Sequence, residues 1–314
     1  MNRIKNSFEI LYSEEAKGYT MVFFAGILWG TIGLFSKSLS EMGASASFIG
    51  FIRLFIGSLI LLPIIFRMGG LKMFKIDKES IRHCLLLGVF SQALFNYCYN
   101  TAIAQVGVAT AAVLLYTSPI FVFIMSVIFF KEAIAKRKII ALILNIFGCF
   151  LVVTGGNISS LNISFMGVFL GVAAGFLYSL VTIIGKIASG RVHPFVIVFY
   201  SFLFGWMTLG IIVRPWEQIA LYSSPEFWAY SFGFGLIPTV GSYLLYMGGL
   251  SKVTEISRVP VIASVETVAA TLIGVFIFKE NLGIVNSLGI VVLILSIRVM
   301  NSRDKLSDLV SEGI

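Results

Sequence analysis

Charged and reactive side chains are scarce in this sequence of 314 residues. Only 12% of the residues are charged, and there are two histidines and three cysteines. A soluble domain usually has about twice that charged fraction, so the composition excludes a water-soluble globular protein. Cys84, Cys98 and Cys149 lie in apolar runs without metal-ligand spacing. We therefore expect neither a disulfide framework nor a metal site.

Motifs of the common hydrolases and nucleotide-driven pumps are also missing. His83 and His193 stand at the ends of apolar runs, and no zinc-protease, serine-hydrolase or phosphate-loop motif is present. We expect a protein that is no enzyme and needs no cofactor, with a polytopic membrane enzyme or a sensor without transport activity as alternatives. The net charge of +8 could suggest nucleic acid, but the basic residues fall in short loops between apolar runs. That distribution is typical of membrane proteins, so no nucleic-acid partner is expected.

Long hydrophobic runs fill most of the chain. The hydrophobic fraction is 58% and the mean hydropathy is +0.98. A helix needs about 20 apolar residues to cross a bilayer, and helices are favoured because open strands leave backbone groups unpaired in lipid. We predict an all-α integral membrane protein with ten transmembrane helices, at residues 20–39, 46–66, 82–103, 107–130, 138–156, 165–187, 194–213, 227–249, 253–278 and 282–300.

The distribution of lysine and arginine predicts the orientation. With the N-terminus inside, most of these residues fall in inner loops, whereas the outer loops hold only Arg214 and Lys279. This bias places both termini in the cytoplasm. The first 19 residues lack the apolar region of a removable signal peptide. We expect a multi-pass protein of the plasma membrane, bacterial by its abundant Ile, Lys and Phe, and the sequence leaves its oligomeric state open.

The two halves of the sequence repeat each other. The segment from Gly26 to Lys37 matches the segment that ends at Lys186, 149 residues after Lys37, and Phe-Lys-Glu at 130–132 recurs 148 residues later at 278–280. Because each half has five spans, the halves enter the membrane from opposite sides, as in many secondary transporters. The predicted organisation is a cytoplasmic segment (1–19), a first five-helix repeat (20–156), a linker (157–164), a second repeat (165–300) and a cytoplasmic tail (301–314).

These features resemble the EamA-type members of the drug/metabolite transporter superfamily. The resemblance rests on the runs from Ser118-Pro119 to Lys131-Glu132 and from Val265-Glu266-Thr267 to Lys279-Glu280. It implies a secondary transporter, and specifically an exporter, of small metabolites such as amino acids. It also implies a central cavity lined by the first, third, fourth, sixth, eighth and ninth helices. The family usually has a proline where this chain has Thr267, which weakens the case for a broken ninth helix.

Glu266 is the only acidic residue deep within a predicted span. A carboxylate at that depth costs about 3 kcal/mol, so it is predicted to bind a substrate ammonium or a proton. The alternative is a structural, hydrogen-bonded or protonated glutamate. Arg258 lies about 12 Å earlier along the same helix, and it is a candidate for binding the carboxylate of a zwitterionic substrate.

Polar and aromatic stripes complete the predicted site. Gln92, Asn96 and Asn100 recur every four residues on one helix face, and Thr239, Ser242, Tyr243 and Tyr246 form a stripe in the other half. These stripes either face a cavity or join helices by hydrogen bonds. The equivalent Lys37 and Lys186 are expected to reach the membrane interface, and Arg53 has no evident partner. The predicted substrate-binding residues are Trp29, Asn96, Tyr99, Tyr178, Tyr243, Tyr246, Arg258 and Glu266.

Overall fold

The protein is all-helical. The computed structural model describes residues 2–157 and 163–302, and every regular element within those residues is a helix. The predicted all-α class is therefore confirmed. Most of the predicted linker at 157–164 and of the predicted C-terminal tail at 301–314 lies outside the described residues.

Local capping signals fix several helix starts in the first part of the chain. The Ser45 hydroxyl accepts a hydrogen bond from the Phe48 amide at 3.3 Å, and Asp77 caps the helix that follows it. The helices here are α1 (Asn2–Gly30), α2 (Ile32–Glu41), α3 (Ala46–Gly69), the 3-10 helix η1 (Gly70–Phe74), α4 (Lys78–Leu86), the π-helix η2 (Leu87–Leu94), α5 (Phe95–Leu115), α6 (Ser118–Phe130) and α7 (Lys136–Thr154).

The second part of the chain follows a similar order. Proline occupies the first turn of the helices that start at Pro194 and Pro225, where the missing amide hydrogen costs nothing. The helices here are α8 (Phe165–Ser189), α9 (Pro194–Val213), η4 (Pro215–Ser223), α10 (Pro225–Phe234), the π-helix η5 (Gly235–Gly241), α11 (Ser242–Lys252), η6 (Ile256–Arg258), α12 (Val259–Ala263), α13 (Val265–Phe276) and α14 (Ile284–Asn301).

Within the described residues, eight helical stretches are long and apolar enough to cross a membrane. One of them, Lys78–Phe130, has 53 residues and is interrupted at Gly107, whose φ is 81°. Large apolar side chains are exposed on the outer faces of the helices, with Phe165 at 87% and Ile284 at 82%. Apolar faces of this extent are suited to lipid, so this is a multi-pass membrane protein.

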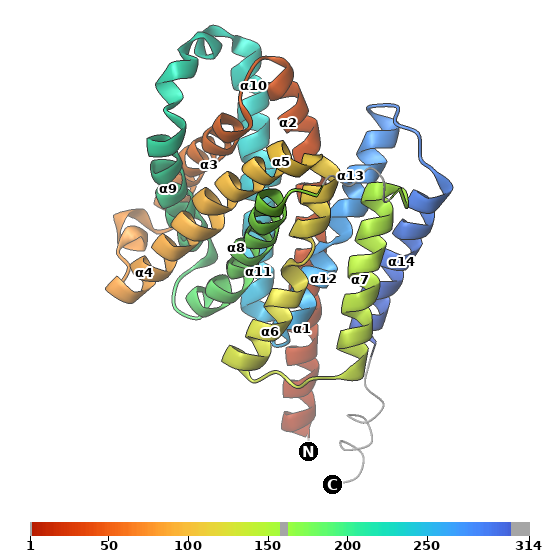
Figure 1. The fold of residues 1–314 in the computed structure, drawn as a ribbon. Helices are drawn as coiled ribbons and strands as arrows, with labels where there is room; N and C mark the ends of the chain where they lie inside the picture. Colours follow the sequence, from red (N-terminus) through yellow and green to blue (C-terminus); the bar gives the residue numbers. More distant parts are fainter. Residues whose placement is uncertain (1, 158–162, 303–314) are drawn as a thin grey trace.

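Helices of the first half pack mainly on helices of the second half. α7 lies along α14, α5 along α8, α1 along α11, and α3 along α9, so the two halves are interleaved (Figure 1). A Cβ atom on Gly26 would lie 2.5 Å from the Ala263 carbonyl oxygen, and one on Gly30 would lie 2.5 Å from Ala269 Cβ. These glycines let α1 approach α12 and α13 closely, because small residues allow close contact between helices.

Several long helices are interrupted near their middle. The two π-helices begin at Leu87 and Gly235, 148 residues apart, and a turn separates α5 from α6 as Ser264 separates α12 from α13. The break at Ser264 forms although no proline follows Glu266. The Ser264 hydroxyl donates to the Val261 carbonyl oxygen at 2.6 Å and accepts from Asn145 Nδ2 at 2.6 Å. Such back-bonding bends a helix without proline.

The ends of the helices define two faces of the molecule. α1 begins and α14 ends at the same end of the bundle (Figure 1), which is called the terminal end below. The connection from α6 to α7 also lies there, whereas the connection from α13 to α14 lies at the opposite end.

Candidate functional site

The break between α5 and α6 and the break between α12 and α13 meet around a small cavity inside the bundle. Its volume is about 20 Å³, which is room for about one water molecule. The site is therefore closed tightly, since a ligand pocket usually has about 300 Å³ or more. The lining residues come from both halves: Tyr116, Ser118, Pro119, Val122, Tyr178, Ser179, Thr182, Tyr246, Pro260, Ala263, Ser264 and Glu266.

Glu266 provides the only carboxylate of this lining. It lies in the first turn of α13, where the helix dipole favours a negative charge. Within the described part of the chain, its carboxylate has no hydrogen-bond or ion-pair partner. Because charges buried in proteins are normally paired, the structure leaves this group available to a ligand.

Aromatic rings form much of the wall around Glu266. Tyr116, Tyr178 and Tyr246 line the cavity, and Trp29 lies behind the last two. The Trp29 ring centroid is 4.9 Å from that of Tyr246 and 6.1 Å from that of Tyr178. Aromatic faces next to a carboxylate suit an organic ammonium group, because a cation is attracted to the ring quadrupole.

Short hydrogen bonds hold these walls in place. Thr267 Oγ1 donates to the Tyr116 hydroxyl at 2.6 Å, and the Thr182 and Tyr246 hydroxyls are also 2.6 Å apart. Asn145, fully buried in α7, donates to Ser264 at the break. Sequence reasoning gave no role to Tyr116, Ser264 or Asn145. The 148-residue repeat pairs Tyr116 with Ser264, and this signal could have found those two residues, whereas it pairs Asn145 only with Leu293.

The predicted site residues divide into groups. Tyr178, Tyr246 and Glu266 line the cavity, and Trp29 supports the two tyrosines. Tyr243 lies outside the lining; its ring is 5.4 Å from Trp29.

The side-chain amides of η2 and α5 are used in hydrogen bonds within and between helices. The Tyr243 hydroxyl donates to Gln92 Oε1 at 3.3 Å, and Asn96 Nδ2 donates to the Gln92 carbonyl oxygen at 2.7 Å. Tyr99 stacks on Phe95, with 5.7 Å between ring centroids. None of these side chains belongs to the cavity lining in this closed form.

The basic candidates lie in three different environments. Lys37 lies over the Phe278 ring at 4.0 Å, and Lys186 donates to the carbonyl oxygens of Leu250 and Val253 at 3.0 and 2.6 Å. Arg53 is only 7% exposed in α3, and within residues 2–157 and 163–302 its guanidinium has no hydrogen-bond or ion-pair partner.

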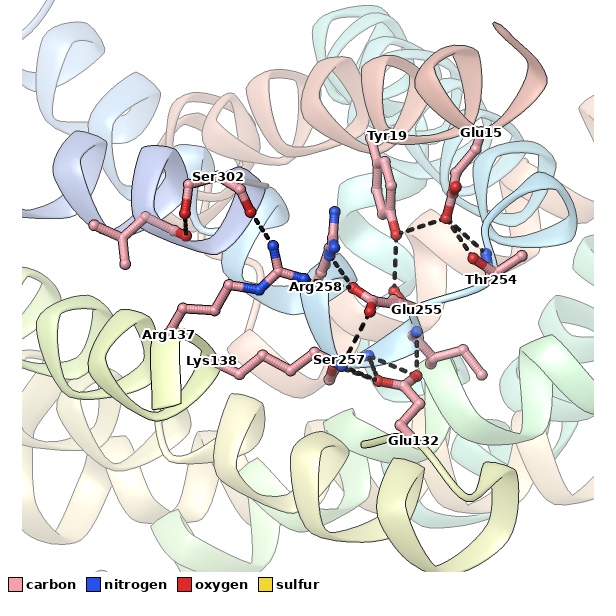
Figure 2. A network of polar contacts seen from close by, with 12 residues as sticks. Glu15, Tyr19, Glu132, Arg137, Lys138, Thr254, Glu255, Ser257, Arg258 and Ser302 are labelled. Atoms are coloured by element: carbon pink, nitrogen blue, oxygen red, sulfur yellow. Dashed lines mark hydrogen bonds and ion pairs between the residues drawn. The ribbon is translucent and has the colours of Figure 1, made fainter. Parts of the chain in front are cut away.

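Arg258 belongs to a network of polar and charged side chains (Figure 2). It is not among the residues that line the cavity. Its guanidinium pairs with Glu255 and lies 5.8 Å from the Tyr19 ring. Glu255 also pairs with Lys138 at 3.5 Å and Arg137 at 3.8 Å. Arg258 is thus neutralised by a carboxylate of the protein.

The fold and the cavity define a class of protein: a multi-pass membrane protein with a buried polar site between two interleaved halves. Comparison with known proteins identifies the family. The EamA-like transporter family model matches this chain twice, over residues 16–154 and 165–302, and the chain belongs to that family. It is a membrane transporter of small molecules and, as the sequence predicted, not an enzyme.

Several relatives span most of this chain. An uncharacterized transporter of Archaeoglobus fulgidus is 29% identical over 276 residues, which cover 87% of this chain and 92% of the relative. The inner membrane transporter YicL of Salmonella typhimurium, also uncharacterized, is 26% identical, covering 92% of this chain and 96% of its own. The pseudopaline exporter CntI of Pseudomonas aeruginosa is 25% identical, covering 70% of this chain and 77% of its own.

A solved crystal structure shares the fold. It superposes with a TM-score of 0.74 at 14% sequence identity, covering 91% of this chain and 96% of the other. At that identity the likeness concerns the fold alone.

Proposed function

We propose that this protein is a secondary transporter that exports small amine-bearing metabolites, amino acids or related zwitterions, by alternating access to the cavity at Glu266. The observation that supports this most is the unpaired Glu266 carboxylate among tyrosine rings at the junction of the two halves. Binding an ammonium group or a proton there removes the cost of the buried charge. The outward direction is supported by a relative that is named an exporter.

A zwitterionic substrate also needs a group that binds its carboxylate. Arg258 was the candidate from sequence, but in this structure it pairs with Glu255. Arg53 also lies outside the lining of the closed cavity, but it is the better candidate, because it is buried in α3 without a partner in the described residues. An unpaired buried cation is costly unless a ligand satisfies it. We therefore assign the ammonium end of the substrate to Glu266 and the carboxylate end to Arg53.

The proposed architecture is ten spans in two inverted repeats, residues 20–156 and 165–300. Two observations support it. The segment Lys78–Phe130 accommodates two spans separated at Gly107, and α10, η5 and α11 form one continuous helix from 225 to 252. The packing also has the symmetry expected of two repeats. α5 packs on α8, and their equivalents in the other half, α11 and α1, pack on each other as well.

The proposed orientation has both termini, and with them the terminal end, in the cytoplasm of the cell. The excess of Lys and Arg in the loops at this end supports it. A membrane-impermeant maleimide applied to intact cells should label a cysteine at exposed Trp216 and not one at exposed Ile134. Labelling at position 134 and not at position 216 would show that the termini lie outside the cell.

Transport itself is tested with purified protein in liposomes. The vesicles are loaded with radiolabelled amino acids, amines, nucleosides or sugars, and efflux is followed with and without a pH gradient. We expect efflux of an amine-bearing compound, slowed by competing amines. Efflux only of sugars or nucleosides, unaffected by amines, would contradict the proposal.

A further inference from the structure

Two equivalent turns end the fourth and ninth spans of the protein. Lys131 and Lys279, 148 residues apart, both adopt left-handed backbone conformations, with φ of 55° and 59°. The next residue is a glutamate in both cases. Its amide bonds back to the helix in the same way, Glu132 to the Ser126 carbonyl and Glu280 to the Gly274 carbonyl. The two turns therefore have the same backbone design at opposite ends of the molecule.

The side chain of Glu132 reaches across to the other half. Its carboxylate accepts hydrogen bonds from the Ile256 amide, from the Ser257 amide at 3.2 Å and from the Ser257 hydroxyl at 2.5 Å. These groups form the start of the ninth span, so Glu132 caps that helix from outside its own half (Figure 2). The Glu132 side chain is only 7% exposed and also pairs with Lys138 at 3.0 Å.

The side chain of Glu280 does not make the equivalent contact. Its carboxylate lies back over its own helix, so that a Cβ atom on Gly274 would come within 2.4 Å of Glu280 Oε2. Within the described residues it has no ion pair. The same turn therefore directs one glutamate across the halves and leaves the other on its own helix.

The residues that Glu280 would cap are less buried than those capped by Glu132. The repeat pairs Ile256 and Ser257 with Val108 and Ala109, which start the segment that runs into α6. Ile256 and Ser257 are 1% and 0% exposed, whereas Val108 is 66% exposed. A Cβ atom on the neighbouring Gly107 would meet nothing within 4 Å in the part of the chain that the structure describes.

We propose that Glu132 and Glu280 are alternating latches of the transport cycle. In the state seen here, Glu132 closes the terminal end by capping the amides of Ile256 and Ser257. In the other state that contact opens, and Glu280 closes the opposite end by capping the amides of Val108 and Ala109. This inference rests on the proposed alternating-access function.

The two latches are unequal, which should favour the state seen here in the absence of substrate. Lys138 pairs with both Glu132 and Glu255, but its equivalent in the second half is Asn286, and the equivalent of Glu255 is Gly107. The terminal latch thus has a buried ion-pair network that the opposite latch lacks. A small bias of this kind sets the populations of two states.

Distances between spin labels test the exchange. One pair of labels is placed at the terminal end with Ile134→Cys and Ser251→Cys, and another at the opposite end with Ala104→Cys and Leu282→Cys, all exposed positions. The background lacks the three native cysteines. Distance distributions are recorded in nanodiscs without substrate, with Glu79→Gln as the control, because Glu79 pairs with Arg191 on the exposed surface.

Glu132→Gln should lengthen the distance at the terminal end and shorten the one at the opposite end. In the double variant with Glu280→Gln, the distance at the terminal end should still lengthen. The distance at the opposite end should no longer shorten, because the opposite latch is then lost too. Ser257→Ala removes one of the donors to Glu132 and should give a smaller shift in the same direction. It provides the test if Glu132→Gln does not fold.

The proposal is overturned if Glu132→Gln and Ser257→Ala leave both distances as in Glu79→Gln. It is also overturned if the double variant still shortens the opposite end. The distances need no transported substrate, so their result is separate from the proposed function. If both label distances stay unchanged but efflux depends on Glu266, the latch proposal is rejected and the proposed function stands. If the distance at the terminal end lengthens and the one at the opposite end shortens, but no amine is transported, the latch proposal stands and only the substrate assignment is rejected.

Discussion

Thr267 donates a hydrogen bond of 2.6 Å to the hydroxyl of Tyr116, across the boundary between the two halves. Tyr116 lies at the break between α5 and α6, and Thr267 lies one residue after Glu266, next to the break between α12 and α13. The bond therefore joins the two interrupted helices beside the carboxylate. Movement of one break should be transmitted to the other and to the position of Glu266.

Tyr116→Phe tests this coupling by deleting one hydroxyl. A buried hydrogen bond contributes about 0.5–1.5 kcal/mol, so we expect a small loss of thermal stability and a clear loss of substrate affinity. Tyr97→Phe on the exposed face of α5 is the control. Both are measured as Tm and as efflux in liposomes. Equal effects of the two variants would show that the hydroxyl does not position the site.

Glu266→Gln tests the proposed ammonium site, because it keeps the shape of the side chain and removes its charge. A charge-assisted hydrogen bond contributes about 1.5–3 kcal/mol, so substrate affinity should fall about 10- to 100-fold. Stability should stay the same or rise, since no protein group within the described residues pairs with this carboxylate. Isothermal calorimetry and thermal unfolding measure the two effects.

Glu217→Gln is the matched control, because Glu217 is exposed and pairs only weakly with Arg214 at 3.5 Å. It should bind substrate like the wild type. If Glu266→Gln binds and transports a cationic or zwitterionic substrate at the normal level, Glu266 is structural.

Asn145→Leu tests what supports the break between α12 and α13. Asn145 is fully buried and donates to Ser264 at 2.6 Å and to Ser296 at 3.3 Å, linking α7, α12 and α14. Leaving these buried hydroxyls without their partner should cost about 1–3 kcal/mol, seen as a lower Tm than that of the exposed control Asn301→Leu. An unchanged Tm would mean that helix packing alone holds the break.

The sequence predicted the class of fold well because bilayer thickness leaves few choices. Runs of about 20 apolar residues have to be helices in lipid, and the repeat of Lys131-Glu132 at Lys279-Glu280 indicated two related halves. Glu266 could be selected because an isolated carboxylate in an apolar run is unusual.

The details of the site could not be predicted, because helix packing decides them. Asn96 and Gln92 share a helix face, yet Asn96 donates to the backbone of Gln92 in a π-helical stretch that hydropathy does not reveal. Arg258 and Glu266 share a span, but the break at Ser264 and the partner Glu255 separate their roles. Partners far apart in sequence remained unknown until the fold was available.

Acid should weaken the start of α4 in a predictable way. The hydroxyl of Ser80 donates to Asp77 and holds the pKa of that carboxyl below its ordinary value of 3.8. A carboxyl with a lowered pKa stabilises the folded state above its ordinary pKa and loses this contribution as the pH falls through the lowered value. Asp77→Asn keeps a capping oxygen but does not titrate. The Tm of the wild type should therefore fall relative to Asp77→Asn only below about pH 4, and a constant difference from pH 7 to pH 3 would contradict this.

Arg53→Gln separates a ligand-binding arginine from a structural one. Arg53 is 7% exposed in α3 and unpaired in the described residues, and an uncompensated buried charge lowers stability. Removing it should leave the Tm unchanged or raise it, whereas removal of a structural ion pair would lower the Tm. Affinity for a zwitterionic substrate should fall about 10- to 100-fold, because the substrate carboxylate loses a charge-assisted hydrogen bond. Affinity for the corresponding amine without the carboxylate should change little. Arg67→Gln, exposed at the end of the same helix, is the control for the loss of one positive charge. Equal losses for the amine and the zwitterion, or a lower Tm, would place Arg53 outside the substrate site.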